Sequence, residues 1–405
     1  INILALVMSN SKLKQPRGLW VLSSCEFASR FSYYGLQASF VLYIARVFSF
    51  SQAQAYLLFG TFTSLAFGLP VIGGWISDRF LSKQLSIFFG MSMTFLGNIC
   101  LFLSPHRSIL FYLGVTLLLV GIGLFKANSL ALLGLFYQPH DRRRESGFTI
   151  LYATMSAGGL LGPLLYGVIL SVSSWHTAFL TGGLVEFCSL ILFVVLSRHL
   201  RVSQNITIFA NGFGSNCLRY VMIRCVATLI PMIVFVFALL FRPDIFNVVF
   251  WLLAIAVILF IGRLYLKETK QDKRKIALLI GVQVLAILYF AYYIQLSGAI
   301  NFFISRFVHL RILGWLVPPQ AYVALEPILF LMLMPAVIGF WARRKIPEKI
   351  ALTRKALLSI LFAGIGFLVF ALAAFVISHS LFVSLICIVL ANLLLAIGEL
   401  HIGPV

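Results

Sequence analysis

Glu26 and Arg30 lie four residues apart in a segment that is otherwise apolar enough to cross a membrane. This spacing puts both side chains on one helix face, where they can form an ion pair. A charge at the centre of a spanning helix costs at least about 2.5–3.5 kcal/mol, so such residues usually face a bundle interior or a water-filled cavity. The pair therefore indicates a transport pathway, with a helix staple near the membrane surface as the alternative.

Four more charged residues fall inside apolar segments: Lys126, Glu186, Glu326 and Glu399. We expect Lys126 to pair with Glu26, because a desolvated lysine keeps its charge only beside a carboxylate. The alternative is that Lys126 snorkels to the cytoplasmic surface. Glu326 could equally be interfacial and Glu399 an acid near a chain end, while Glu186 has no obvious partner and is expected to be structural.

These charges predict a cavity with cations from the first half of the chain and acids from the second. Arg30 and Lys126 would hold a carboxylate, and Glu399 together with Glu326 would hold an ammonium group. Such a cavity suits a zwitterion. A carboxylate that pairs with Arg30 in one state and is protonated in another also supplies a proton switch.

Membrane-spanning helices must position these residues. Of the 405 residues, 61% are hydrophobic and 10% are charged, which excludes a soluble protein. Apolar segments of about 20 residues cross the roughly 30 Å hydrocarbon core, and backbone groups in lipid need internal partners, so we expect an all-α, polytopic helical bundle. The predicted spans are residues 19–46, 53–76, 84–104, 107–136, 147–170, 176–197, 218–241, 244–266, 275–304, 319–342, 352–377 and 380–405.

The net charge of +20 follows the membrane topology. Cations gather before the first span and after the even-numbered ones, as in Arg142–Arg144 and Lys267–Lys275, and the opposite loops have few. This pattern places the N-terminus in the cytoplasm of a multi-pass protein, which we expect in the inner membrane. The positive charge therefore indicates association with the lipid bilayer and not with a nucleic acid.

Other functional classes find no support in the sequence. The six cysteines form no CxxC pair, which favours packing over a metal site or disulfide framework. A glycosylation sequon begins at Asn205, but it falls in a predicted cytoplasmic loop, so we expect it to be a chance match. No nucleophile–base pair or phosphate loop stands out, so we expect neither an enzyme nor a cofactor or bound metal.

The spans divide into two halves and an insert. We expect a cytoplasmic segment at 1–18, a six-helix bundle at 19–200, a linker with two inserted spans at 201–274 and a C-terminal bundle at 275–405. Two halves around a midplane site are typical of secondary transporters. The second half has four spans of an expected six and ends in an apolar run, which favours a truncated chain.

A loop between the second and third spans reads Gly74-Trp75-Ile76-Ser77-Asp78-Arg79. Its glycine would let two helices approach closely. Its aspartate would bond a neighbouring helix N-terminus and form a breakable latch on the cytoplasmic side. The sequence thus predicts an inner-gate motif at Gly74, Asp78 and Arg79.

The chain resembles the proton-dependent oligopeptide transporter family of the major facilitator superfamily. The resemblance runs from about Gly18 to Val405. It rests on the segments Glu26–Gly35, Ala55–Thr63, Gly73–Arg79, Gly121–Asn128, Gly147–Tyr152 and Gly398–Glu399. It implies the major facilitator fold with two extra helices between the halves, and alternating-access symport of di- and tripeptides with protons.

The resemblance also implies functional positions. Proton coupling falls on Glu26, Arg30, Lys126 and Glu399. Substrate binding falls on Arg30, Tyr33, Tyr34, Lys126, Tyr152, Ser156, Gln295, Glu326 and Glu399. Tyrosine hydroxyls would bind a peptide backbone without selecting a side chain, although Tyr33 and Tyr34 could equally be packing residues.

Several positions depart from the family pattern. Two acids expected in proton coupling are Ser29 and Ile294 in this chain, and an outer arginine–aspartate pair is replaced by Gln37 and Ser305. Three binding positions also differ, at Phe67, Ser156 and Glu326. The alternatives are therefore a relative that moves another small zwitterion or amino compound without proton coupling, and a non-transporting receptor or fragment. We expect a monomer.

Overall fold

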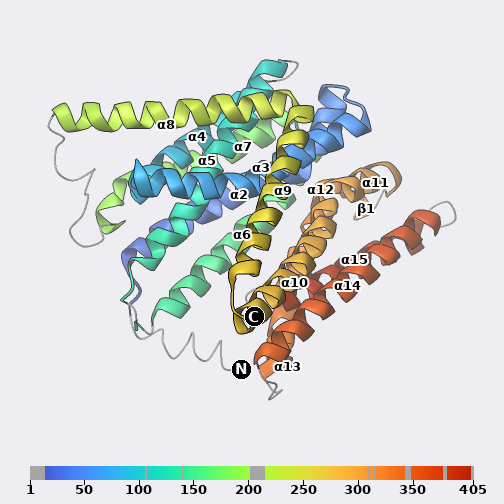
Figure 1. The fold of residues 1–405 in the computed structure, drawn as a ribbon. Helices are drawn as coiled ribbons and strands as arrows, with labels where there is room; N and C mark the ends of the chain where they lie inside the picture. The colour runs from blue at the N-terminus through green and yellow to red at the C-terminus, as the bar shows by residue number, and fades with distance from the viewer. Residues whose placement is uncertain are drawn as a thin grey trace. The chain divides into compact units, whose positions relative to one another are not determined.

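Helices begin and end close to the predicted apolar segments in the computed structural model of the protein (Figure 1). The structure describes residues 14–402 except 105–106, 139, 142, 201–214, 309–310, 313–314, 343–347 and 377–380. The N-terminal segment predicted at 1–18 is therefore described only from Lys14. Arg142, the sequon at Asn205 and residues 403–405 lie outside the described residues.

The chain forms two compact units, Asn2–Pro243 and Asp244–Val405. The helices of the first unit are α2 (Arg17–Val47), α3 (Gln52–Arg79), α4 (Lys83–Phe102), α5 (Ser108–Gly134), α6 (Arg143–Val172), α7 (Trp175–Val195), η2 (Ser197–Leu200) and α8 (Ser215–Phe241).

The second unit carries the remaining helices and two very short strands. They are α9 (Pro243–Lys267), α10 (Lys270–Tyr293), η3 (Ile294–Leu296), α11 (Ala299–Phe307), β1 (Arg311–Ile312), β2 (Trp315–Leu316), α12 (Pro319–Val323), α13 (Leu325–Ala342), α14 (Glu348–Val376) and α15 (Leu381–Ile402). In Figure 1, α14 and α15 run side by side.

Ten helical segments among the described residues are long and apolar enough to cross a membrane. In addition, α15 contributes a shorter apolar stretch, Ile386–His401. The helix α2 is not one of the ten, and it is the helix that carries Glu26 and Arg30. The protein is therefore a helical, multi-pass membrane protein, as its composition predicts.

Local sequence explains where helices begin. The Ser51 hydroxyl accepts a hydrogen bond from the Gln54 backbone N–H, and the Gln54 side-chain oxygen accepts one from the Ser51 backbone N–H, which forms a capping box at the start of α3. Ser82 caps α4 in a simpler way by accepting from the Leu85 amide at 3.2 Å. Each cap satisfies backbone donors that the first turn leaves without a partner.

The helix α2 lies against α6 and α7 in the first unit, and its inner face is almost entirely buried. Gly158 on α6 makes the close approach possible, because a Cβ there would lie 2.5 Å from the Phe27 carbonyl oxygen. Helices in membranes use small residues in this way to bring backbones together. The contact holds in place the turn of α2 that carries Arg30.

Two predicted spans are interrupted. The span predicted at 275–304 ends as an α-helix at Tyr293 and resumes as α11 after Gly298, whose ψ of −109° is not helical. The span predicted at 319–342 is divided into α12 and α13. Pro327 has no N–H to bond to the carbonyl of Val323, the last residue of α12, and in a continuous helix its ring would collide with that carbonyl. Both segments nevertheless remain long and apolar enough to cross a membrane, as Asp272–Phe307 and Pro319–Trp341, which agrees with the predicted spans.

The all-α fold class is confirmed, and the only pairing of strands in the described chain is the two-residue antiparallel contact of β1 with β2. It joins Arg311 to Leu316 and Ile312 to Trp315, within the connection between α11 and α12. The predicted fold class holds for the rest of the described chain.

Candidate functional site

A narrow pocket lies inside the first unit, between α2, α3 and α5. Its volume of about 10 Å³ leaves room for about one water molecule. Its walls are formed by Glu26, Ser29, Arg30, Tyr33, Ala66, Ile122, Phe125 and Lys126. Four of the predicted site residues thus come together here: Glu26, Arg30, Tyr33 and Lys126.

The predicted ion pair between Glu26 and Arg30 is present on one face of α2. Arg30 Nε lies 3.5 Å from Glu26 Oε2, and the Glu26 side chain is 1% exposed. Ser129, on α5, donates a hydrogen bond of 2.7 Å to Glu26 Oε1. The carboxylate therefore has a cation on one oxygen and a hydroxyl on the other, deep inside the bundle and not at its surface.

Lys126 does not have the predicted partner. No ion pair within 4 Å joins it to Glu26 in the described part of the chain, because the Glu26 oxygens are turned toward Arg30 and Ser129. Instead, the Lys126 ammonium lies over the Phe67 ring, 4.7 Å from its centroid. Phe67, where the family resemblance implies a tyrosine, thus contacts the second cation of the pocket.

The tyrosines of α2 differ in their surroundings. Tyr33 is buried, stacks on Phe62 with ring centroids 5.7 Å apart, and packs edge-on against Tyr34 at 5.1 Å. Its hydroxyl has no hydrogen-bond partner among the described residues, although it lies on the pocket wall. Tyr34 interacts with the Arg30 side chain. Both tyrosines therefore pack in the bundle and also lie near the Arg30 side chain.

Two predicted binding residues on α6 lie outside the pocket lining. Tyr152 is exposed, with a relative accessibility of 37%. The Ser156 hydroxyl donates to the Tyr152 carbonyl at 3.0 Å, so it is engaged within its own helix.

A second acidic cluster lies inside the second unit. Glu326 on α13 is 1% exposed, so its side chain is enclosed by the protein. The Tyr293 hydroxyl, at the end of α10, donates to Glu326 Oε2 at 3.3 Å. The Glu399 carboxyl, on α15, contacts the same carboxyl group. Gln295 lies in η3 with its side chain exposed.

Glu186 on α7 is completely buried, as a structural residue would be. Neither of its carboxyl oxygens has a hydrogen bond of good geometry in the described part of the chain, and a polar side chain that acts on it is Thr94 on α4.

Ser129 and Tyr293 were not predicted as site residues. Their only sequence signal was a hydroxyl in an otherwise apolar segment.

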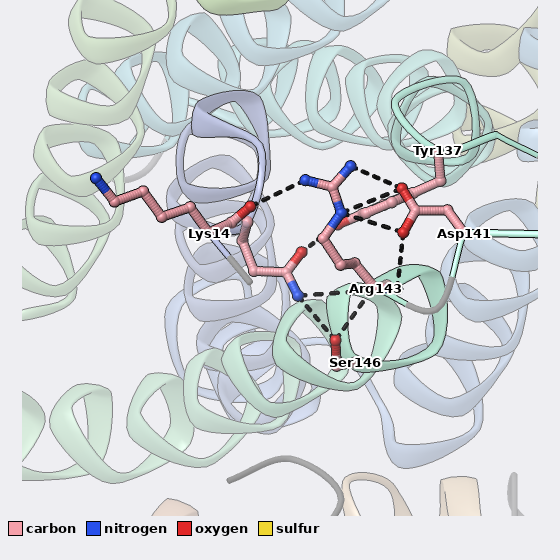
Figure 2. A network of polar contacts seen from close by, with 6 residues as sticks. Lys14, Tyr137, Asp141, Arg143 and Ser146 are labelled. Carbon is pink, nitrogen blue, oxygen red and sulfur yellow. Dashed lines mark hydrogen bonds and ion pairs between the residues drawn. The ribbon is translucent and has the colours of Figure 1, made fainter. Parts of the chain in front are cut away.

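A polar network joins the start of α2 to the start of α6 (Figure 2). Arg143 donates to Asp141 through Nε and Nη2, and through Nη1 to the Lys14 carbonyl at 3.0 Å. The Gln15 side chain donates to Ser146 Oγ at 2.8 Å and accepts from the Tyr137 hydroxyl at 3.0 Å. The cationic run around Arg143, predicted as a topology signal, thus also ties the N-terminal segment to the bundle.

This network predicts a pH-dependent contribution to stability. Hydrogen bonds from the Arg143 side chain hold the pKa of Asp141 below its ordinary value of 3.8. The unfolded chain therefore binds the proton first, so the contribution is full above about pH 5 and is lost as the pH falls through the lowered pKa. We expect thermal unfolding midpoints of the wild type and Asp141→Asn to differ slightly at pH 7 and to converge as the pH falls below the lowered pKa of Asp141. A difference independent of pH would contradict this assignment.

The inner-gate motif is only partly as predicted. Asp78 accepts a hydrogen bond of 2.6 Å from Lys83 Nζ, the first residue of α4, and does not cap that helix itself. The Arg79 guanidinium lies over the Trp75 ring at 5.8 Å. A Cβ on Gly74 would be 3.5 Å from the Ala127 Cβ, which is an ordinary contact. The close approach between helices is made by the neighbouring Gly73.

Related proteins match nearly all of this chain and about four fifths of their own length. The model of the POT family matches residues 80–405. Dipeptide and tripeptide permease A of Erwinia pyrifoliae is 28% identical over 400 residues, which cover 98% of this chain and 79% of the permease. The permease of the same name from Klebsiella pneumoniae is 28% identical over 398 residues, 98% of this chain and 78% of that one.

Solved structures agree with this comparison. A crystal structure of the peptide transporter POT in complex with sulfate is 25% identical and superposes with a TM-score of 0.81, covering 97% of this chain and 81% of that one. A POT family transporter in complex with 5-aminolevulinic acid is 22% identical with a TM-score of 0.79, covering 97% and 83%. The fold of the chain is therefore that of these transporters.

Proposed function

The chain belongs to the POT family, and on that premise we propose that it is a secondary active transporter, not an enzyme, that carries di- and tripeptides together with protons. The names of its permease relatives support the peptide substrate. The observation that carries the proposal is the pocket in the first unit. It places a carboxylate, a guanidinium and an ammonium group within one small volume inside the helical bundle.

The Glu26–Arg30 pair supplies the proton switch. While Glu26 is ionised, it holds Arg30, and the buried pair carries no net charge. A proton on Glu26 removes the attraction and releases the guanidinium, which can then take a peptide carboxylate in a planar, two-point geometry. Lys126, on the same pocket wall, adds a second positive charge for that carboxylate.

The second unit contains an acidic cluster of its own. Glu399 and Glu326 would hold the ammonium group of the peptide, with the Tyr293 hydroxyl orienting Glu326. Alternating access would then expose the loaded protein to one side of the membrane at a time. We place the N-terminus in the cytoplasm and the protein in the inner membrane, on the distribution of cations between loops. We propose a monomer as the working unit.

One observation favours a second function. Ser29 lines the pocket where the family resemblance implies a glutamate, and Ile294 stands where a second acid is implied. With those two acids absent, coupling would depend on Glu26 and on the acids of the second unit. An uncoupled relative that moves another small zwitterion or amino compound is therefore the alternative.

Uptake of labelled dialanine into proteoliposomes, with and without an inward proton gradient, tests the proposal. We expect the gradient to drive accumulation above the external concentration. Downhill exchange alone would support the uncoupled alternative. If protein that elutes as a folded species gives no flux of dialanine in either condition, peptide transport is refuted, and a different substrate or a non-transporting receptor follows.

A further inference from the structure

Glu186 is a buried acid of the first unit that the proposed transport mechanism does not use. It lies near the middle of α7, its side chain is completely buried, and neither carboxyl oxygen has a hydrogen bond of good geometry among the described residues. Such a carboxyl group is costly to ionise, because the charge has been removed from water. The groups around it therefore decide whether it carries a charge or a proton.

The hydroxyl of Thr94, on α4, faces this carboxyl group as a hydrogen-bond acceptor. Thr94 Oγ1 and the Glu186 carboxyl group are within reach of a hydrogen bond. The single hydrogen of that hydroxyl is directed to its own helix, toward the carbonyls of Met91 at 2.9 Å and Gly90 at 3.2 Å. Thr94 therefore presents a lone pair to Glu186. An ionised carboxyl group also has only lone pairs, so a bond between the two requires a proton on Glu186.

Asn98, one turn further along the same face of α4, presents a second acceptor. Its amide group donates to Ser32 Oγ at 2.8 Å and to the Thr94 carbonyl at 2.9 Å, which uses both amide hydrogens. Its Oδ1 atom has no hydrogen bond of good geometry in the described part of the chain. A Cβ on Gly182 would lie 3.0 Å from this oxygen, so Oδ1 lies beside α7 one turn before Glu186. This face of α4 thus offers acceptors to Glu186 and not donors.

The helices packed against α7 bring acidic groups to Glu186. The titratable groups that interact electrostatically with it, among the described residues, come from α2 and α6: Cys25, Glu26 and Tyr166. The charged residue of α4 is Lys83, at its first position, about 16 Å along the helix from Thr94. The element η2 begins beyond Val195, where α7 ends, about 13 Å along that helix from Glu186.

We propose that Glu186 is a second proton-binding site of the first unit, at which the carboxylic acid donates its hydrogen to Thr94 Oγ1 and joins α7 to α4. The ligand is one proton from water, and the only bond formed is the O–H bond of the acid, so the occupied site is neutral. An ionised carboxylate here would face the lone pairs of α4 and the negative charge of Glu26. The acid faces a hydrogen-bond acceptor instead.

The bound proton gives the two acids of the first unit different tasks. Glu26 is ionised and lies 3.5 Å from Arg30. A second carboxylate nearby would repel Glu26 and compete for the same guanidinium, so a proton on Glu186 leaves Arg30 to Glu26 alone. This consequence rests on the proposed function, in which Glu26 releases Arg30. The proton site itself does not, because its test measures unfolding and not transport.

Reversible unfolding of the full chain by urea in detergent micelles tests the proposal. Glu186→Gln is the reference, because the amide has the shape of the protonated acid and does not titrate. A glutamate in the unfolded chain has an ordinary pKa of about 4.3, so between about pH 5.5 and pH 7 unfolding of the wild type releases one proton more than unfolding of the variant. The folded state holds that proton, so the wild type loses stability relative to the variant as the pH rises. We expect the ratio of their unfolding equilibrium constants, wild type over variant, to rise about tenfold for each pH unit.

Glu145→Gln is the matched control, because Glu145 is exposed in the first turn of α6 and its ratio to the wild type should stay constant over the same pH range. The titrations are repeated with sodium chloride replaced by choline chloride at equal ionic strength. A ratio for Glu186→Gln that does not change with pH overturns the proposal. Dependence on sodium would then identify an ionised carboxylate that binds a sodium ion, and dependence on neither would identify one that is stabilised within the protein. If Glu186→Gln does not fold, Glu186→Met replaces it, because any neutral side chain gives the same pH dependence of the ratio.

Discussion

Proton-driven accumulation of dialanine is expected to fall at least about tenfold when Glu26 is replaced by Gln, a loss of about 1.4 kcal/mol of coupling or more. The amide is close in shape to a protonated carboxyl and can still accept the hydrogen bond from Ser129. It cannot ionise, so Arg30 stays released at every pH. Exchange of labelled for unlabelled dialanine across the membrane requires no net proton movement and should persist.

Ser129→Ala is the matched control for this variant. It removes the hydroxyl that donates to Glu26 Oε1 but leaves the charge pair with Arg30 in place. We expect it to retain most of the proton-driven accumulation. Normal accumulation in Glu26→Gln would refute the proton switch, and equal losses in both variants would show that the hydrogen bond, not the charge, is what Glu26 provides.

The parts of the site that depend on local spacing could be predicted from the sequence. Glu26 and Arg30 lie on one helix at a separation of four, and helix geometry alone brings them together. The apolar segments likewise predict the helices, because the length needed to cross a membrane is set by the thickness of the bilayer. Both predictions use only the properties of a single helix.

Contacts between helices could not be predicted in this way. Whether Gly73 or Gly74 makes the close contact with α5 depends on a rotation of about 100° around the axis of α3, and the sequence does not specify that rotation. The pairing of Glu326 with Glu399 depends on how α13 packs against α15, and the pairing of Lys126 with Phe67 depends on how α5 lies against α3. Each of these needs the helix packing as well as the residue types.

Gly73→Ala is expected to lower the free energy of unfolding by about 1–3 kcal/mol or more, as overpacking of a close contact does. A Cβ on Gly73 would lie only 2.1 Å from the backbone oxygen of Gly123 on α5. Backbone cannot turn away as a flexible side chain can, so α3 and α5 must separate. That separation would increase the distance between Ala66 and Lys126, which lie on opposite helices of the pocket wall. Transport should therefore fall together with stability.

Gly68→Ala provides a matched control on the same helix. Nothing lies within 4 Å of a Cβ at Gly68, while the substitution gains the same intrinsic helix preference, about 1 kcal/mol in soluble helices. We therefore expect Gly68→Ala to unfold at or above the wild-type temperature, measured by size-exclusion chromatography after heating in detergent, and to transport normally. Equal stability of the two variants would show that α3 and α5 can accommodate a Cβ at Gly73 without separating. The pocket wall would then not depend on the contact between Gly73 and Gly123.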